Sequence, residues 1–287
     1  MKKRGFVALA SAAVLAVAAL LGGCGHKHTY EKGWTFDSNT HWHEPTCKHF
    51  AMYGNEAKHT YDKEGYCTVC GHEKTKFTFA YNADKTGFIL TGQGEFDEET
   101  LHVPETYMHL PVVAIGECAF IKGEFAELYI PSSVKEIGEK AFAECPNLEY
   151  VSLGSGVQTI GFGAFTKCPY LEQVSVGLGL QYVKESAFKD CRSLRGFVMS
   201  EGVKEIGVRA FSGCKRIGSI FIPLSVEKIG MLAFHNMEDL TSIRCGATAL
   251  PMNWDEDWNT TSASVTWGVQ TESGDDQNGG SGGPSIH

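Results

Sequence analysis

Residues 137–159 have the sequence IGEKAFAECPNLEYVSLGSGVQT, and this unit decides the fold because it recurs along the chain. An Ala-Phe pair marks each copy, at Ala119-Phe120, Ala141-Phe142, Ala164-Phe165, Ala187-Phe188, Ala210-Phe211 and Ala233-Phe234. The first step is 22 residues and the other four are 23. An Ile or Val lies five residues before each Phe, and four copies have a Cys three residues after it. This agreement predicts a repeat protein.

Each unit contains two short apolar segments and a closing turn. Leu148, Val151 and Leu153 include the alternation of a half-buried strand, and Val157 and Ile160 begin a second segment. The Ala-Phe-x-x-Cys segment is expected to form a single helical turn with these side chains inward. One unit has too little apolar surface to fold alone, so neighbouring units must stack. We therefore expect an α/β repeat solenoid of about 23-residue units over residues 111–246.

Four cysteines occupy equivalent positions of successive units: Cys145, Cys168, Cys191 and Cys214. Stacked units place equivalent residues ~5 Å apart, but their Cα–Cβ bonds run parallel. The Cβ atoms of a disulfide must converge to ~3.8 Å, so this ladder should consist of buried free thiols.

The 23-residue pattern resembles the BspA-like leucine-rich repeats of bacterial surface proteins. The resemblance covers about residues 77–270 and implies a leucine-rich-repeat-like solenoid that presents a binding face. It also implies a lead-in over residues 77–110 and a carboxy-terminal cap over 247–270, which contains Trp254, Trp258 and Trp267. Residues 271–287 are rich in Gly, Ser and Asp, the composition of a flexible tail.

The amino terminus carries an export signal. Lys2, Lys3 and Arg4 precede an uncharged apolar run that is too short for a comfortable membrane span. The run ends in Leu21-Gly-Gly-Cys24, which resembles a bacterial lipobox, and this implies cleavage after residue 23 and lipidation of Cys24. The expected location is the extracellular face of the cell envelope, with a lipid anchor in the membrane. The alternative is an ordinary signal peptide in which Cys24 is incidental.

Residues 24–76 form a separate block that holds seven of the 11 His residues. Cys67 and Cys70 have the spacing of a metal knuckle, and Cys47 with His59 would complete a Cys3His zinc site in a zinc-ribbon-like module. His49 is the competing fourth ligand. Three interpretations stay open: a structural zinc ion, a disulfide, or solvated side chains.

Charge and missing motifs exclude several function classes. The chain has 25 Lys and Arg against 34 Asp and Glu, and loss of residues 1–23 removes three of the basic residues. No basic cluster follows, which argues against a nucleic-acid partner. Outside the Gly-rich tail of residues 271–287, the sequence has no Gly-x-Ser-x-Gly elbow, phosphate-binding Gly-rich loop or His-Glu-x-x-His motif, so we do not expect an enzyme.

One face of the predicted solenoid has the composition of an interface. The outward strand positions carry uncharged and aromatic side chains, with charge only towards the ends; the candidate contacts are Tyr129, Tyr150, Val198, Phe221 and Arg244. Scattered exposed apolar residues are also normal on a soluble protein. The sequence predicts recognition or adhesion through binding of an extracellular protein or glycan. The alternative is a zinc-handling lipoprotein in which the repeats are scaffold.

Overall fold

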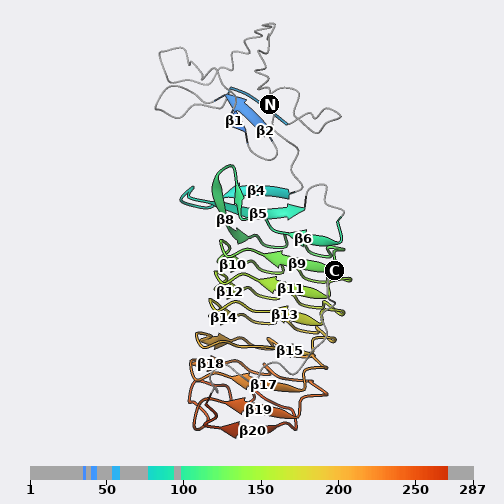
Figure 1. Cartoon of the computed structure of the whole chain (residues 1–287), viewed down its shortest axis with the longest axis vertical. Coiled ribbons are helices and arrows are strands. Elements are labelled where there is room, and N and C mark those ends of the chain that lie inside the picture. Colours follow the sequence, from blue (N-terminus) through green and yellow to red (C-terminus); the bar gives the residue numbers. More distant parts are fainter. Residues whose placement is uncertain (1–34, 37–39, 44–53, 59–76, 94–97, 271–287) are drawn as a thin grey trace, which may run out of the picture.

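The computed structural model describes residues 35–36, 40–43, 54–58, 77–93 and 98–270. The first three strands form an antiparallel sheet of their own, in the order β1 (Thr35–Phe36), β2 (Thr40–His43) and β3 (Gly54–Lys58). From Phe77 onward the chain winds into a solenoid whose turns stack one below the next (Figure 1).

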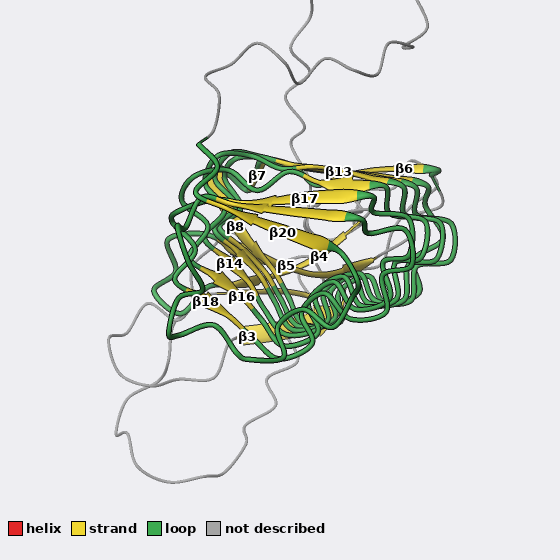
Figure 2. Cartoon of the chain, turned by 90° about the horizontal axis from the view of Figure 1, so that it is seen from below, coloured by secondary structure: helices red, strands yellow, loops and turns green. Residues whose placement is uncertain are grey.

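Two sheets line the solenoid. The back sheet contains β4 (Phe77–Tyr81), β5 (Phe88–Gln93), β8 (Leu110–Ile115), β10 (Glu136–Ile137), β12 (Thr159–Ile160), β14 (Tyr182–Val183), β16 (Glu205–Ile206) and β18 (Lys228–Ile229), and β7 (Thr106–Tyr107) pairs with β8. The front sheet contains β6 (Thr100–His102), β9 (Glu127–Ile130), β11 (Tyr150–Leu153), β13 (Gln173–Ser175) and β15 (Gly196–Phe197), then β17 (Ser219–Ile222), β19 (Ser242–Cys245) and β20 (Ser264–Trp267). Figure 2 shows the two sheets on opposite sides of the stack.

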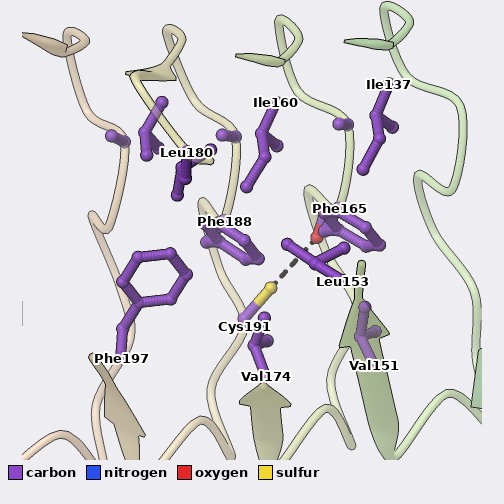
Figure 3. Close-up of a cluster of buried hydrophobic side chains, with 14 of the residues drawn as sticks. Ile137, Val151, Leu153, Ile160, Phe165, Val174, Leu180, Phe188, Cys191 and Phe197 are labelled. Atoms are coloured by element: carbon purple, nitrogen blue, oxygen red, sulfur yellow. Dashed lines mark hydrogen bonds between the residues drawn. The ribbon is translucent and has the colours of Figure 1, made fainter. Parts of the chain in front are cut away.

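The strand register confirms the repeat solenoid. Ile137 pairs with Ile160, and Val151 pairs with Val174, so equivalent residues of successive units lie side by side in parallel strands. The six Phe side chains of the Ala-Phe pairs stack into one column through the core, with neighbouring ring centroids 5.3 to 5.8 Å apart. Part of this core is drawn in Figure 3. Each layer therefore supplies half of the apolar contacts that its neighbour needs.

The segment that carries each Phe is a pair of tight turns, where the sequence predicts a single helical turn. Ala187 N donates to Lys184 O (3.2 Å) and Lys189 N donates to Ser186 O (3.0 Å). Ser186 (φ 57°) and Asp190 (φ 61°) flank Phe188 in the left-handed region, and this ends the helical path on both sides. Strands are the only regular elements in the described part of the chain.

The cysteine ladder consists of buried free thiols, as predicted. Cys145, Cys168, Cys191 and Cys214 are fully buried and unbonded to one another as disulfides. Each Sγ donates to the carbonyl oxygen of a Phe in an earlier turn, for example Cys191 to Phe165 at 3.0 Å (Figure 3). Burial raises the pKa of the Cys191 and Cys214 thiols, so they stay protonated and able to donate at neutral pH.

The front sheet is interrupted between β15 and β17, although the back sheet is continuous at the same level. Phe197 fills the inward position at which the neighbouring strands have Val174 and Ile220. Its ring packs against both Phe188 (5.1 Å) and Phe211 (4.9 Å). The larger side chain holds the front strands apart, and the ladder is lost at this point.

Candidate recognition surface

The front face consists of the front-sheet side chains that point away from the core. These side chains form two columns, because outward positions pair with outward positions: Tyr150 lies beside Glu127 and Gln173, and Ser152 lies beside Tyr129 and Ser175. The inward positions between them, such as Val151 and Leu153, are buried. The alternation predicted from the repeat therefore builds a continuous outward surface.

An aromatic cluster occupies the amino-terminal part of the front face. The His102 and Tyr129 rings stack at 4.7 Å and 12°, and the Tyr129 and Tyr150 rings lie 5.7 Å apart. The Tyr129 hydroxyl donates to Glu127 Oε2 (3.0 Å), and this bond, with smaller contributions from burial and the Glu127 charge, raises the pKa of the Tyr129 phenol. The hydrogen bond fixes the ring in place and uses the hydroxyl hydrogen, so both lone pairs of the oxygen stay able to accept.

A second cluster lies on the carboxy-terminal part. Phe221 pairs with Arg244, whose guanidinium lies 6.0 Å from the Phe221 ring centroid. This is a cation–π contact. Val198 is 66% exposed, one strand before Phe221. The five predicted contact residues thus share the front face but form two groups, with uncharged Ser152, Ser175 and Gln173 between them.

Sequence reasoning missed two features of this surface. His102 was missed because it lies in the lead-in, which departs from the 23-residue period; the structure shows it paired opposite Tyr129. Leu178 (79% exposed) and Leu224 (68% exposed) lie at the corners that follow β13 and β17. A search for Leu at positions where other units have Ser or Glu would have found them.

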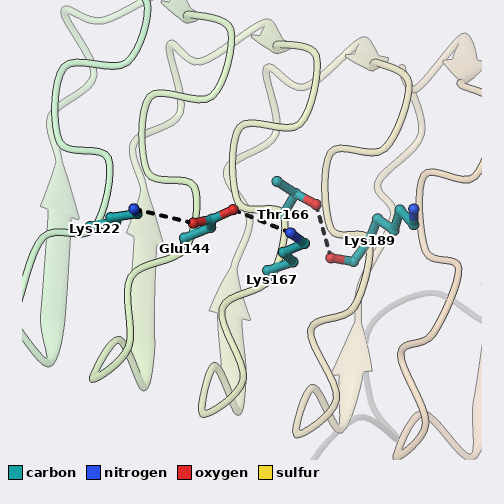
Figure 4. Close-up of polar contacts among 5 residues, drawn as sticks. All are labelled: Lys122, Glu144, Thr166, Lys167 and Lys189. Atoms are coloured by element: carbon teal, nitrogen blue, oxygen red, sulfur yellow. Dashed lines mark hydrogen bonds and ion pairs between the residues drawn. The ribbon is translucent and has the colours of Figure 1, made fainter.

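The other sides of the solenoid carry charge ladders across the turns. Glu205 on the back sheet bonds Lys184 (3.1 Å) and Lys228 (3.3 Å). On the side formed by the Ala-Phe turns, Glu144 pairs with Lys122 (3.8 Å) and Lys167 (3.3 Å), as drawn in Figure 4. Such mixed-charge surfaces favour solubility, and they contrast with the uncharged centre of the front face.

A hollow of about 860 Å³ lies beside the first front strands. Its polar lining includes the carboxylates of Glu98, Glu99, Glu124 and Glu149. The other polar side chains of its lining belong to Gln93, Lys122, Asn147 and Tyr170.

The lipidation and zinc predictions concern residues outside the described ranges: Cys24, Cys47, His49, His59, Cys67 and Cys70. They stay predictions. Within residues 77–93 and 98–270, no three His, Cys, Asp or Glu side chains are grouped so that they could hold a metal ion. The described part of the chain also contains no helix long and apolar enough to cross a membrane.

Comparison with known proteins agrees with this architecture. Residues 113–244 match the BspA type leucine rich repeat region in six copies. A leucine rich cell surface protein from Faecalibacterium prausnitzii is 25% identical, with a TM-score of 0.51; the match covers 63% of this chain and 56% of that one. A leucine rich repeat protein from T. pallidum is 27% identical, with a TM-score of 0.43, and the match covers 59% and 68% of the two chains. No curated protein matches the chain in sequence. Residues 113–244 are therefore similar to the BspA type leucine rich repeat region, and they form the repeat solenoid described above.

Proposed function

We propose that this chain is a bacterial cell-surface recognition protein that binds an extracellular protein or glycan through the front face. The observation that carries the proposal is the pair of clusters on the front face: His102, Tyr129 and Tyr150 at one end, and Phe221 with Arg244 at the other. Aromatic and Arg side chains are enriched where proteins bind partners, and the sheet of a solenoid offers an extended surface for them.

Two further observations support a surface location. The similar Faecalibacterium prausnitzii structure is that of a leucine rich cell surface protein. The segment Leu21-Gly-Gly-Cys24 resembles a lipobox, and lipidation of Cys24 would anchor the chain to the membrane. The test is the Cys24→Ala variant: its precursor should keep residues 1–23 and should stay unlipidated, as read by intact mass. A wild-type mature chain that starts at any other residue would contradict the anchor.

Binding is tested with the labelled mature protein on panels of epithelial cells, bacterial cells and immobilised glycans. We expect saturable binding that falls about tenfold or more in Tyr129→Ala, because truncation of an anchoring aromatic residue costs ~2 kcal/mol or more at an interface. Tyr182→Ala is the matched control, since Tyr182 is half-buried on the back sheet. An equal loss in both variants, or an absence of saturable binding on every panel, would refute recognition by the front face.

A further inference from the structure

The carboxy-terminal end of the solenoid is capped on its back half. The cap residues supply the hydrogen bonds that another turn would have made. Asp255 N donates to Ile229 O of β18 (2.8 Å). In the last turn, Leu232 N donates to Asp257 O (2.8 Å) and Phe234 N donates to Trp258 O (3.1 Å). Trp258 also packs edge-on against Phe234, so the Phe column ends against an aromatic side chain.

The front half ends differently, on the open edge of β20. In Figure 2 the solenoid is seen from the end that carries this strand. Among the described residues β20 pairs with β19 alone. Ser264 N donates to Thr241 O (3.0 Å), and alternate residues of a parallel strand face the same neighbour. Ser264 and Thr266 therefore face β19, and the N–H and C=O groups of Val265 and Trp267 face outward.

The side chains at this end are also incompletely covered. Val265 and Trp267 are half-buried, whereas the residues that pair with them on β19, Ile243 and Cys245, are fully buried. Trp267 contacts Trp254 of the cap at 5.8 Å. An additional strand beside β20 would cover Val265 and Trp267 in the way that β20 covers Ile243 and Cys245.

The strand lacks the devices that keep edges from pairing. Proteins protect edge strands with charged residues, proline or a β-bulge. The sequence Ser-Val-Thr-Trp has no charge and no proline. At the opposite end of the molecule, the outer strand β4 shifts register at Thr78 and Phe79, as a bulge does. No other described strand pairs with the outer edge of β20, which can therefore accept a strand.

Charge indicates what kind of strand fits. Asp255, Glu256 and Asp257 are all exposed and lie at the same end of the solenoid, in its capped back half, where Asp255 N bonds Ile229 O and Asp257 O accepts from Leu232 N. A second copy would bring the same three carboxylates to this end of the molecule, and the full sequence has a net charge of −9. Like charges oppose such a dimer, and a cationic partner is favoured.

We propose that β20 accepts an extended, positively charged segment of a partner protein, which pairs with it as a further strand at the open end of the solenoid. This is strand addition, in which main-chain hydrogen bonds provide the affinity and alternate side chains provide the selectivity. The apolar side chains of the segment would pack on Val265 and Trp267, and its Lys or Arg residues would be attracted by the carboxylates of Asp255 and Asp257 at the same end of the solenoid. The interaction is separate from recognition by the front face.

The first test measures the free edge by amide exchange on the full mature chain. The amides of Val265 and Trp267 should exchange freely, and that of Thr266 should be protected by its bond to β19. Protection of all three amides in the free protein would overturn the proposal. Sedimentation would then show whether a second copy occupies the edge.

The second test adds model strands and follows the same amides. The probes are the capped peptides (Lys-Val)4 and (Glu-Val)4. The cationic peptide should bind at least about tenfold more tightly and should protect the Val265 amide. Val265→Pro removes the outward N–H while Ser264 and Thr266 keep their bonds to β19, so it should reduce binding about tenfold or more, whereas Val265→Ala should retain most of it.

Charge reversal gives an independent variant if the proline variant fails to fold. Asp255→Lys with Asp257→Lys should abolish the preference for the cationic peptide, and Glu227→Lys on the back sheet should preserve it. Equal binding of the two peptides, no binding of either, or undiminished binding by folded Val265→Pro would each refute the proposal.

Discussion

The back sheet and the front sheet are built from the same repeats, yet only the back ladder runs unbroken from β8 to β18. The front ladder stops at β15 and starts again at β17. On the back sheet, the inward Ile or Val of each unit is followed directly by Gly in five of the six units, at Gly116, Gly138, Gly161, Gly207 and Gly230. A Cβ at Gly207 would lie 2.4 Å from Glu185 N, so the absent side chain lets this turn approach the previous backbone.

The front corners have no such uniform column. The equivalent positions after each front strand are Pro131, Gly154, Gly177, Ser200, Pro223 and Gly246. Gly154 and Gly246 donate to the preceding turn at 2.8 and 2.9 Å, but Pro223 has no N–H to donate. The break falls between the units of Ser200 and Pro223, where Phe197 also enlarges the core. Pro131 occupies the same corner after β9, which still pairs with β6, so the large side chain of Phe197 is what distinguishes the level of the break.

The largest expected effect comes from removing the core that both ladders share. Phe188 is fully buried and contacts Phe165, Phe197 and Phe211, so it bridges the level of the front break. Phe188→Ala should lower the free energy of unfolding by about 3–5 kcal/mol, measured by denaturant titration. Glu227→Ala, at an exposed site, should cost less than about 0.5 kcal/mol. Similar losses in the two variants would contradict the assigned register.

A pair of glycine substitutions tests the comparison most directly. Gly207→Ala places a methyl group against the backbone of the previous turn and should cost about 1–3 kcal/mol. Gly196→Ala lies beside the front break, where no atom is within 4 Å of the added Cβ. It should be neutral or stabilise the fold by about 0.5 kcal/mol, through the entropy of the unfolded chain. Thermal unfolding measures the stability of both variants. A larger loss of stability in Gly196→Ala than in Gly207→Ala would refute this explanation of the two ladders.

The turns that connect back to front offer a gain in stability. Ser186 adopts φ 57°, and the equivalent residue of the preceding unit is Gly163 at φ 56°. Ser186→Gly should therefore stabilise the protein by about 1 kcal/mol, because it removes the left-handed strain of a residue with a Cβ. Ser193→Gly serves as the control, since φ of Ser193 is not positive. No gain at residue 186 would show that the surrounding turn already relieves the strain.

The smallest effect concerns the ion triad of the back sheet. Burial disfavours the charged form of Glu205, but the hydrogen bonds and charges of Lys184 and Lys228 outweigh it and hold the pKa of Glu205 below its ordinary value. The pKa of Glu205 is lower in the folded protein than in the unfolded chain, where it is about 4.3, so ionised Glu205 stabilises the fold fully above about pH 4.3. This stabilisation is lost as the pH falls through the folded-state pKa. Glu205→Gln should remove this pH-dependent part of the free energy of unfolding, which is under about 1 kcal/mol because both Lys partners are exposed to solvent. Denaturant unfolding of the wild type and the variant at pH 6 and pH 3 measures this part. The same pH dependence in both proteins would contradict the role of the triad.

The sequence predicted the buried columns well, because a strict period reports register directly. The Phe column, the thiol ladder and the outward positions of Tyr129 and Tyr150 lie where the repeat places them. It did not predict the front break, since Phe197 matches the apolar pattern and differs only in size. It also missed the left-handed turn residues, because Ser186 or Leu232 carries no local signal for a positive φ. Partner residues and the open edge depend on what covers each surface, which a repeat pattern does not specify.

The break between β15 and β17 has a mechanical consequence. Ladder hydrogen bonds of a solenoid run along the stacking axis, so a pull on the two ends of the stack loads them in tension. At this level the load is carried by the bonds between β16 and β18, by the bonds between the Ala-Phe turns, such as Phe188 N to Ala210 O (2.8 Å), and by the packing of Phe188 on Phe211. Under an axial force, we expect this joint to yield before its neighbours and to divide the rod into two stiffer segments.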